Sequence, residues 1–212
     1  MALQYQVVPV TRFQQNCSIV WCDETMKGVV IDPGGDVKHL LMMIEQLKVD
    51  VEKLVLTHGH LDHVGGSEEL SRALNQPIVG PHKEDNFWLQ GLERQSQEFR
   101  FPLTEAFEPS QWLDEGDVIT FGLQSLHVIH TPGHTPGHIT LFNKEAKLAF
   151  VGDVLFKGGV GRTDFPKGDF NTLIDSIKTK LWALGNDTRF VPGHGPESTF
   201  GVERACNPFV ED

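Results

Sequence analysis

Cysteine is scarce in this chain. Cys17, Cys22 and Cys206 are the only three among 212 residues, and no two of them form a CxxC pair. A small, odd number of scattered cysteines does not provide a disulfide framework, so the sequence favours a reducing compartment. The first residues, MALQYQVVPVTRFQQNC, include neither a basic n-region nor an apolar h-region, so we expect no secretory signal. The sequence therefore predicts a cytoplasmic protein.

A surplus of basic residues and long apolar runs are also absent. Lys and Arg number 18 against 29 Asp and Glu, which gives a formal net charge of −11. Nucleic-acid binding depends on side chains that neutralise phosphates, so we expect no nucleic acid as the main partner. No apolar run is long enough to span a bilayer, so we expect no membrane partner either. The sequence leaves open whether the protein is a monomer or a small homo-oligomer.

Strand-like and helix-like segments follow one another along the whole chain. Apolar segments rich in β-branched residues, which are typical of strands, lie at 18–22, 28–35, 53–60, 76–82, 118–122, 126–134, 138–142, 147–153 and 189–195. Apolar residues at helical spacing predict helices over 37–47, with Asp36 as N-cap, and over 174–184, and a shorter helix begins near Ser67. We therefore predict one layered α/β domain over residues 1–212, with helices covering the sheet faces.

The segment 83–112 has little periodicity for its length. A long, partly helical insertion of this kind often serves as a lid or a binding loop. The alternative is a surface excursion that is packed by Phe87, Trp88 and Phe99. Both interpretations stay open at this stage.

Four of the strand-like segments end in a histidine or aspartate flanked by glycine. His58 and His60 follow KLVLT, His134 follows LHVIHTPG, Asp153 follows KLAFVG, and His194 follows RFVPG. In layered α/β folds, functional sites collect where loops leave the ends of strands, and glycine permits tight turns there. The sequence therefore predicts that these side chains belong to one site.

The stretch THGHLDHVGG adds Asp62 and His63 to the same region. His58 and His60 are two positions apart in extended chain, so they project to the same side. Imidazoles this close repel one another when protonated, and a divalent metal removes that problem by binding their lone pairs. Imidazole and carboxylate are ligands that zinc, iron and manganese accept. Seven candidate ligands are too many for one tetrahedral ion and fit two ions that share a carboxylate.

These motifs carry a resemblance to a known family. THGHLDHVGG, TPGHTPGH, VGDVLF and VPGHGPEST, in this order, resemble the metallo-β-lactamase fold superfamily, over nearly the whole chain. Within it the chain is most similar to glyoxalase II (hydroxyacylglutathione hydrolase), in its short bacterial, YcbL-type form. The resemblance implies an αββα sandwich with two divalent metal ions at one edge. Zinc is the expected metal, with iron or manganese as the alternatives.

The resemblance also assigns the ligands. One metal is expected to bind His58, His60, His134 and Asp153, and the other to bind Asp62, His63, His194 and the same Asp153. Asp153 stands where several β-lactamases of the superfamily have cysteine, and His60 stands where the flavodiiron branch has glutamate. Both departures make those branches less suitable as models of function.

The implied substrate is a small-molecule thioester such as S-D-lactoylglutathione, with a role in methylglyoxal detoxification. Hydroxide bridging two ions roughly 3.5–4 Å apart would attack the carbonyl, and Asp62 and Asp153 would be the catalytic carboxylates. Arg162 falls where longer enzymes have a basic substrate-binding residue, with a structural salt bridge as the alternative. We expect no C-terminal glutathione-binding helical domain, and Tyr5 is the only tyrosine.

Two other functions remain open. A persulfide dioxygenase would use one iron held by His58, His134 and Asp153; the stretch GRTDF also resembles such enzymes. A non-catalytic metal-binding module would close its ligands to water, whereas the glycine-rich loops favour an accessible edge. No GxSxG elbow is present.

Overall fold

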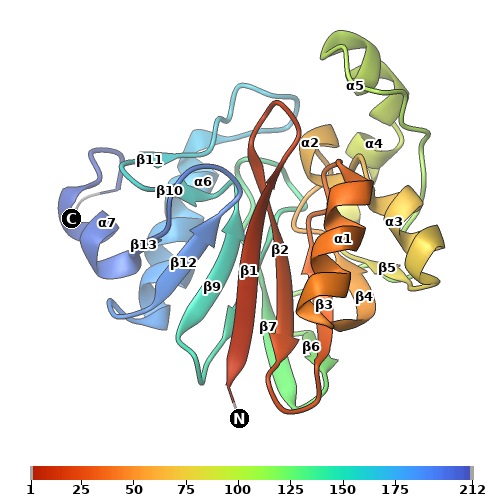
Figure 1. The fold of residues 1–212 in the computed structure, drawn as a ribbon. Helices are drawn as coiled ribbons and strands as arrows, with labels where there is room; N and C mark the ends of the chain where they lie inside the picture. The colour runs from red at the N-terminus through yellow and green to blue at the C-terminus, as the bar shows by residue number, and fades with distance from the viewer. Residues whose placement is uncertain (1, 211–212) are drawn as a thin grey trace.

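Two β-sheets form the centre of the structure, a computed structural model that describes residues 2–210 (Figure 1). The first sheet has the order β1 (Leu3–Val10), β2 (Gln15–Cys22), β3 (Lys27–Ile31), β4 (Asp50–Val55), β5 (Ile78–Val79). The second has the order β13 (Ser198–Thr199), β12 (Arg189–Pro192), β9 (Leu148–Gly152), β8 (Ile139–Asn143), β7 (Gln124–His130), β6 (Val118–Phe121). A separate hairpin pairs β10 (Leu155–Phe156) with β11 (Gly159–Val160).

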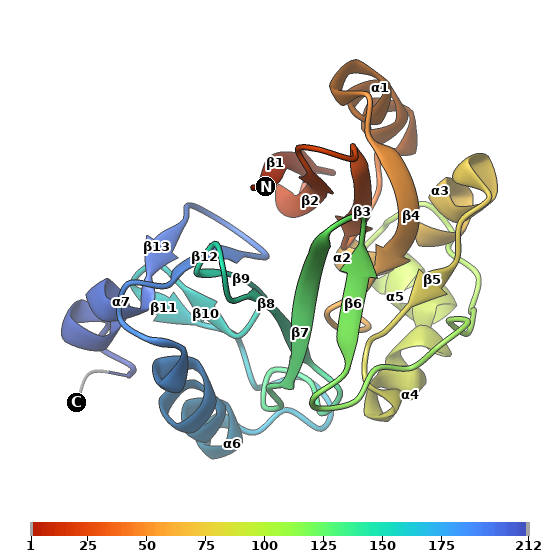
Figure 2. The same cartoon turned by 90° about the horizontal axis from the view of Figure 1, so that it is seen from below.

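Helices lie on the outer faces of both sheets and at one edge of the sandwich (Figures 1 and 2). They are α1 (Val37–Leu47), α2 (Leu61–Val64), α3 (Ser67–Leu74), the 3-10 helix η1 (Lys83–Asp85), α4 (Asn86–Leu89), α5 (Leu92–Glu98), α6 (Phe170–Asp175), the π-helix η2 (Ser176–Leu181), the 3-10 helix η3 (Trp182–Leu184) and α7 (Phe200–Cys206). The helices α1 and α3 cover the first sheet, whereas α6 and α7 cover the second (Figure 2). Within residues 2–210, no helix has the length and apolar character needed to cross a membrane.

The strands β2, β3, β8 and β9 are buried on both faces, which explains why they read as nearly continuous apolar runs. Successive side chains point to opposite faces. Ile19 packs in the cluster that contains Leu40 of α1, whereas Val20 packs between the sheets in the cluster that contains Leu141. On the far side, Val151 packs in a third cluster with Ile177 of η2. Three apolar layers therefore separate four structural layers, and the predicted αββα sandwich is confirmed.

The ends of several strands meet at one edge of the sandwich. The neighbouring strands β9 and β12 are parallel, so both deliver the following loop to the same edge. The tip of the β1–β2 hairpin, α2, and the α4–α5 pair also lie at this edge, at the top of Figure 1. The segment 83–112, which was predicted to be partly helical, contains η1, α4 and α5, and the last two lie beside the site.

The structure corrects two details of the predicted elements. The stretch 3–10 was not among the predicted strands, yet it forms β1 at the edge of the first sheet, where Pro9 is tolerated. Asp36 does precede α1, but its side chain makes no capping bond to that helix. Its carboxylate instead accepts the Thr11 N–H at 2.6 Å, which fixes the β1–β2 hairpin against the start of α1.

Candidate metal centre

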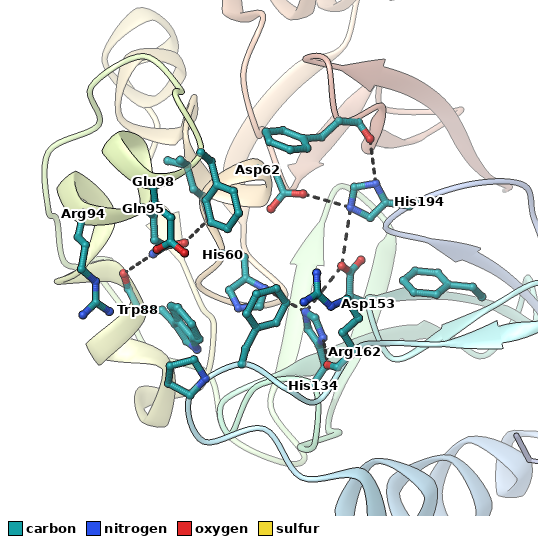
Figure 3. A pocket seen from close by; sticks show the side chains of 16 residues that line it. His60, Asp62, Trp88, Arg94, Gln95, Glu98, His134, Asp153, Arg162 and His194 are labelled. Atoms are coloured by element: carbon teal, nitrogen blue, oxygen red, sulfur yellow. Dashed lines mark hydrogen bonds and ion pairs between the residues drawn. The ribbon is translucent and has the colours of Figure 1, made fainter.

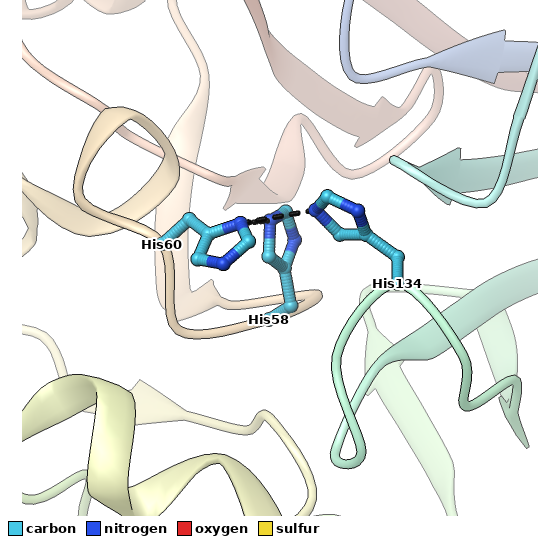
Figure 4. A group of neighbouring side chains, drawn as sticks. All are labelled: His58, His60 and His134. Atoms are coloured by element: carbon cyan, nitrogen blue, oxygen red, sulfur yellow. Dashed lines mark hydrogen bonds between the residues drawn. The ribbon is translucent and has the colours of Figure 1, made fainter. Parts of the chain in front are cut away.

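Three imidazoles converge at the edge described above (Figure 4). His58 follows β4, His60 immediately precedes α2, and His134 lies in the loop after β7. His60 Nδ1 lies 3.1 Å from His58 Nε2 and 3.0 Å from His134 Nε2. All three side chains are buried. Three ring nitrogens thus point at one another, and little of each side chain is exposed.

Hydrogen bonds on the far side of two of these rings assign their tautomers. His134 Nδ1 lies 2.7 Å from the Arg162 carbonyl oxygen, which only accepts, so this nitrogen carries the proton. Thr57 Oγ1 donates to Asp32 at 2.6 Å and therefore accepts from His58 Nδ1 at 3.1 Å. Both Nε2 atoms consequently turn lone pairs toward His60.

The protonation of these three imidazoles agrees with a ligand role. Burial, reinforced by neighbouring imidazoles, lowers the pKa of His58 and of His60 well below the ordinary value. Burial also lowers the pKa of His134, although Asp153 opposes the shift. Neutral imidazoles with converging lone pairs are the state that a metal ion requires.

A second group lies next to the first and contains Asp62, His63 and His194. His194 Nε2 is 3.2 Å from Asp62 Oδ2, and one ligand atom of each of the three residues lies within 4.8 Å of the others. Their outer nitrogens are held in the same way as in the first group. His63 Nδ1 donates to Asp32 Oδ2 at 2.9 Å, and His194 Nδ1 donates to the Phe13 carbonyl at 3.2 Å.

Asp153, directly after β9, faces both groups. Its Oδ1 lies 3.3 Å from His63 Nε2, and its Oδ2 lies 3.7 Å from both His134 Nε2 and His194 Nε2. Asp153 Oδ1 and His63 Nε2 are buried and have no hydrogen-bond partner among the described residues. Unsatisfied buried polar atoms are costly unless another group binds them. The carboxylate therefore has the position of a ligand shared by two ions.

The carboxylates of Asp62 and Asp153 in and beside this second group are stabilised by positive charge. Burial opposes ionisation of Asp153, but His63 and the other imidazoles hold the pKa of its carboxyl below the ordinary value. Burial likewise opposes protonation of His63, yet Asp153 and Asp62 raise its pKa well above the ordinary value. Protons on imidazole thus balance the carboxylates, and divalent cations would supply that charge instead. The donor set fits two such ions, and all seven predicted ligand residues lie together.

A cavity of about 680 Å³ opens directly onto these groups (Figure 3). Its volume lies within the usual range of roughly 300–1,000 Å³ for small-molecule sites. His60, Asp62, His134, Asp153 and His194 line its floor. The aromatic side chains that line it are Phe13, Trp88, Phe99, Phe156 and Phe165.

The family can now be stated. A family model described as Metallo-beta-lactamase superfamily matches residues 10–194. The chain belongs to this superfamily. The protein named Hydroxyacylglutathione hydrolase GloC of Haemophilus influenzae is 46% identical to it over 98% of each chain. The resemblance to glyoxalase II that the motifs indicated is thereby confirmed.

Two solved structures of the superfamily are similar over nearly their whole length. The B3 metallo-beta-lactamase BLEG-1 has a TM-score of 0.91 and 31% identity, covering 99% of this chain and 100% of its own. The protein TTHA1623 in a di-iron-bound form has a TM-score of 0.88 and 35% identity, covering 97% of this chain and 100% of its own.

Arg162, the predicted substrate contact, does line the cavity of this superfamily member. Its guanidinium donates two hydrogen bonds to Asp164, at 2.9 and 2.7 Å, and lies 4.5 Å from the centre of the Phe165 ring. Arg162 therefore faces the cavity and also forms a salt bridge, and its contact with a substrate stays a prediction.

Asp85 holds the loops of the centre together, and sequence reasoning missed it. Its buried carboxylate accepts the Gly59 N–H at 2.8 Å, the Gly137 N–H at 2.6 Å and the Thr135 hydroxyl at 2.7 Å. Burial raises the pKa of Asp85 to about 6, against these three hydrogen bonds, which lower it. The carboxylate joins the loop of His58 and His60 to the loop of His134. No sequence motif marked it, because its partners are distant in the chain.

His138 also supports a ligand, although it contributes no atom to the converging groups. Its Nε2 accepts the backbone N–H of Asp153 at 3.0 Å, and its ring stacks on His58 at 4.8 Å between centroids. It therefore orients the loop that carries the shared carboxylate.

Asp32→Asn is expected to weaken metal binding by about 10- to 100-fold, as loss of a partner behind a ligand usually does. Asp32 accepts from His63 Nδ1 and from both the N–H and the hydroxyl of Thr57. An amide has one acceptor oxygen, so it cannot keep all three bonds. Competition with a chromophoric chelator measures the affinity, with the exposed Asp50→Asn as the control. Equal affinities in both variants would contradict this role for Asp32.

Proposed function

We propose that the protein is a metal-dependent thioester hydrolase of the glyoxalase II type, acting on S-D-lactoylglutathione or a related acyl thioester. The observation that carries the proposal is the Asp153 carboxylate between two groups of converging ligands, at the floor of an open cavity. The hydroxyacylglutathione hydrolase that is 46% identical over almost the entire chain supports the choice of substrate class.

In this proposal, His58, His60, His134 and Asp153 hold one divalent ion, and Asp62, His63, His194 and Asp153 hold the other. Zinc is the expected metal, with iron or manganese as alternatives; the di-iron form of a similar structure supports keeping iron. When bound, the pair of ions supplies Lewis acidity and lowers the pKa of a coordinated water molecule.

The side chains around the floor have separate tasks. Asp62 faces the cavity, and its carboxylate is held by His194 at 3.2 Å. In this position the carboxylate accepts a hydrogen bond from the attacking water molecule and orients it. The leaving thiol has an ordinary pKa of about 8.5 and departs as thiolate, so no separate general acid is needed. The aromatic walls limit the access of bulk water to the ester.

Arg162 is kept as a proposed substrate contact. Its charge is paired with Asp164, so binding of a substrate carboxylate would exchange one carboxylate for another. We further propose a single domain over residues 1–212 that acts in the cytoplasm on small-molecule thioesters, with neither nucleic acid nor membrane as a partner, as a monomer or small homo-oligomer.

The test is turnover of S-D-lactoylglutathione by protein loaded with zinc or, separately, with iron. We expect loss of the thioester absorbance that stops when a chelator removes the metal and resumes when metal is added back. Protein with two bound ions per chain and no turnover would overturn the proposal.

The persulfide dioxygenase alternative has less support, because the similarity to a hydrolase extends over the full chain. It predicts oxygen consumption by the iron-loaded protein with glutathione persulfide. β-Lactam hydrolysis is assayed in parallel, since a B3 metallo-beta-lactamase is among the similar structures. The relative rates on the three substrates decide among these reactions.

A further inference from the structure

Two opposite charges on one side of α5 face the cavity without a protein partner. Arg94 and Glu98 both line the cavity and are exposed. Among residues 2–210, neither side chain makes a hydrogen bond or an ion pair, and the two side chains do not pair with each other although they are four positions apart. An exposed Arg and Glu at this spacing are able to approach within 5–6 Å, about one helical turn.

The other cations around the cavity are already engaged. Arg162 binds Asp164. Arg12 donates to the Phe99 carbonyl, and Lys167 lies 4.1 Å from the centre of the Phe87 ring. Of the two arginines that line the cavity, Arg94 is therefore the one whose N–H donors are available to a ligand.

The helix that carries both charges is anchored to the metal-binding loop. Gln95, between them in sequence, is buried, accepts the Leu61 N–H at 3.0 Å and donates to the Trp88 carbonyl at 2.9 Å. Leu61 lies between His60 and Asp62, so the position of α5 is fixed relative to two of the proposed ligands. Figure 3 shows Arg94, Gln95 and Glu98 together on α5, on the side of the cavity away from His194.

We propose that Arg94 and Glu98 bind the α-amino-acid group of the thiol half of the substrate, Arg94 its carboxylate and Glu98 its ammonium. This inference rests on the proposed thioester hydrolysis and names the class of thiol that the site accepts. A group with both charges on one carbon matches two unpaired opposite charges about one turn apart, and charge-assisted hydrogen bonds to each are strong. The γ-glutamyl end of glutathione carries such a group, whereas a pantetheine thiol carries none.

The experiment compares Arg94→Gln and Glu98→Gln on three lactoyl thioesters: those of glutathione, of N-acetylglutathione, which lacks the ammonium, and of N-acetylcysteamine, which is neutral. Arg94→Gln is expected to raise KM for S-D-lactoylglutathione about 10-fold or more, with kcat changed less than about twofold, and to leave KM for the neutral thioester unchanged. Glu98→Gln is expected to raise KM for S-D-lactoylglutathione but not for its N-acetyl form. Arg94→Lys should recover part of the loss.

The matched control is Arg72→Gln, which removes an exposed arginine of α3 outside the cavity and should leave every KM unchanged. The inference is overturned if Arg94→Gln keeps the wild-type KM for S-D-lactoylglutathione, or if it raises KM for the neutral thioester by the same factor. Calorimetric binding of S-methylglutathione, which cannot be hydrolysed, separates this outcome from failure of the proposed function. Arg94-dependent binding without any turnover would support the subsite and reject the hydrolase; turnover without Arg94 dependence would do the reverse.

Discussion

Asp153→Ala is expected to lower kcat/KM for S-D-lactoylglutathione by about 10³-fold or more and to reduce the bound metal below two ions per chain. Asp153 is the carboxylate whose two oxygens face His63 on one side and His134 and His194 on the other. Its removal takes a shared ligand from both proposed sites at once. It also removes the carboxylate that lies between His63, His134 and His194, and leaves only Asp32 beside His63 and Asp62 beside His194.

Metal analysis after dialysis and steady-state kinetics on the same samples check this result. Asp175→Ala, at the exposed end of α6, is the matched control and should keep both metal content and activity. Far-UV circular dichroism of the variant verifies that the fold is retained. If Asp153→Ala binds two ions and turns over substrate at the wild-type rate, the assignment of a shared ligand is wrong.

The metal centre could be predicted from the sequence because its ligands come from short motifs at strand ends. Each strand supplies an apolar run that ends in glycine and a chemically distinctive residue, as in LAFVGD before Asp153. The parallel pair β9 and β12 then brings two such ends to one edge. Local sequence patterns therefore predicted which residues lie together, whereas the distances among them could be obtained only from the three-dimensional structure.

The supporting residues could not be predicted in the same way. Asp85 and Gln95 both lie in the segment 83–112, which lacks periodicity, and each bonds to backbone groups far away in sequence. A single polar residue in an irregular segment gives no sign of which loop it will reach. Strand β1 escaped prediction for a related reason, since exposed polar positions and Pro9 interrupt its apolar pattern. What the sequence left out is the long-range contact that ties α4 and α5 to the centre.

The two walls of the cavity differ in how they treat charge. The loop that carries Arg162 neutralises its own cation with Asp164 and stacks it on Phe165. Among residues 2–210, the side chains of Arg94 and Glu98 on α5 have no ion-pair partner, while Gln95 ties this helix to Leu61 and Trp88. The proposed metal ligands at the floor of the cavity are therefore held by the sandwich, whereas the charged side chains of α5 are available to bind the substrate. We expect variation in substrate to be encoded in α5 rather than in the strand-end motifs.

Gly193→Ala is expected to lower kcat/KM by about 10²-fold and to weaken metal binding, although it adds only one methyl group. A Cβ at Gly193 would overlap Asp153 Oδ1 and lie 2.6 Å from His63 Cε1, so it would displace ligands of both proposed ions. The backbone has little freedom to withdraw. The Gly193 N–H donates to the Gly152 carbonyl at 2.7 Å, and its own carbonyl accepts the Asn16 N–H at 2.7 Å.

The backbone of Gly193 does not have a positive φ, so alanine is not strained there and any loss comes from the added methyl group. Gly159→Ala in the β10–β11 hairpin is the control, because a Cβ at that position meets its nearest neighbour at 4.0 Å and the φ angle is again not positive. Metal titration and steady-state kinetics of Gly193→Ala and Gly159→Ala show whether the loss is specific to a methyl group at position 193. If Gly193→Ala keeps the wild-type metal affinity, the loop after β12 has moved to make room for the methyl group. In that case, the close approach of Gly193 to Asp153 is not required to hold the shared carboxylate in place.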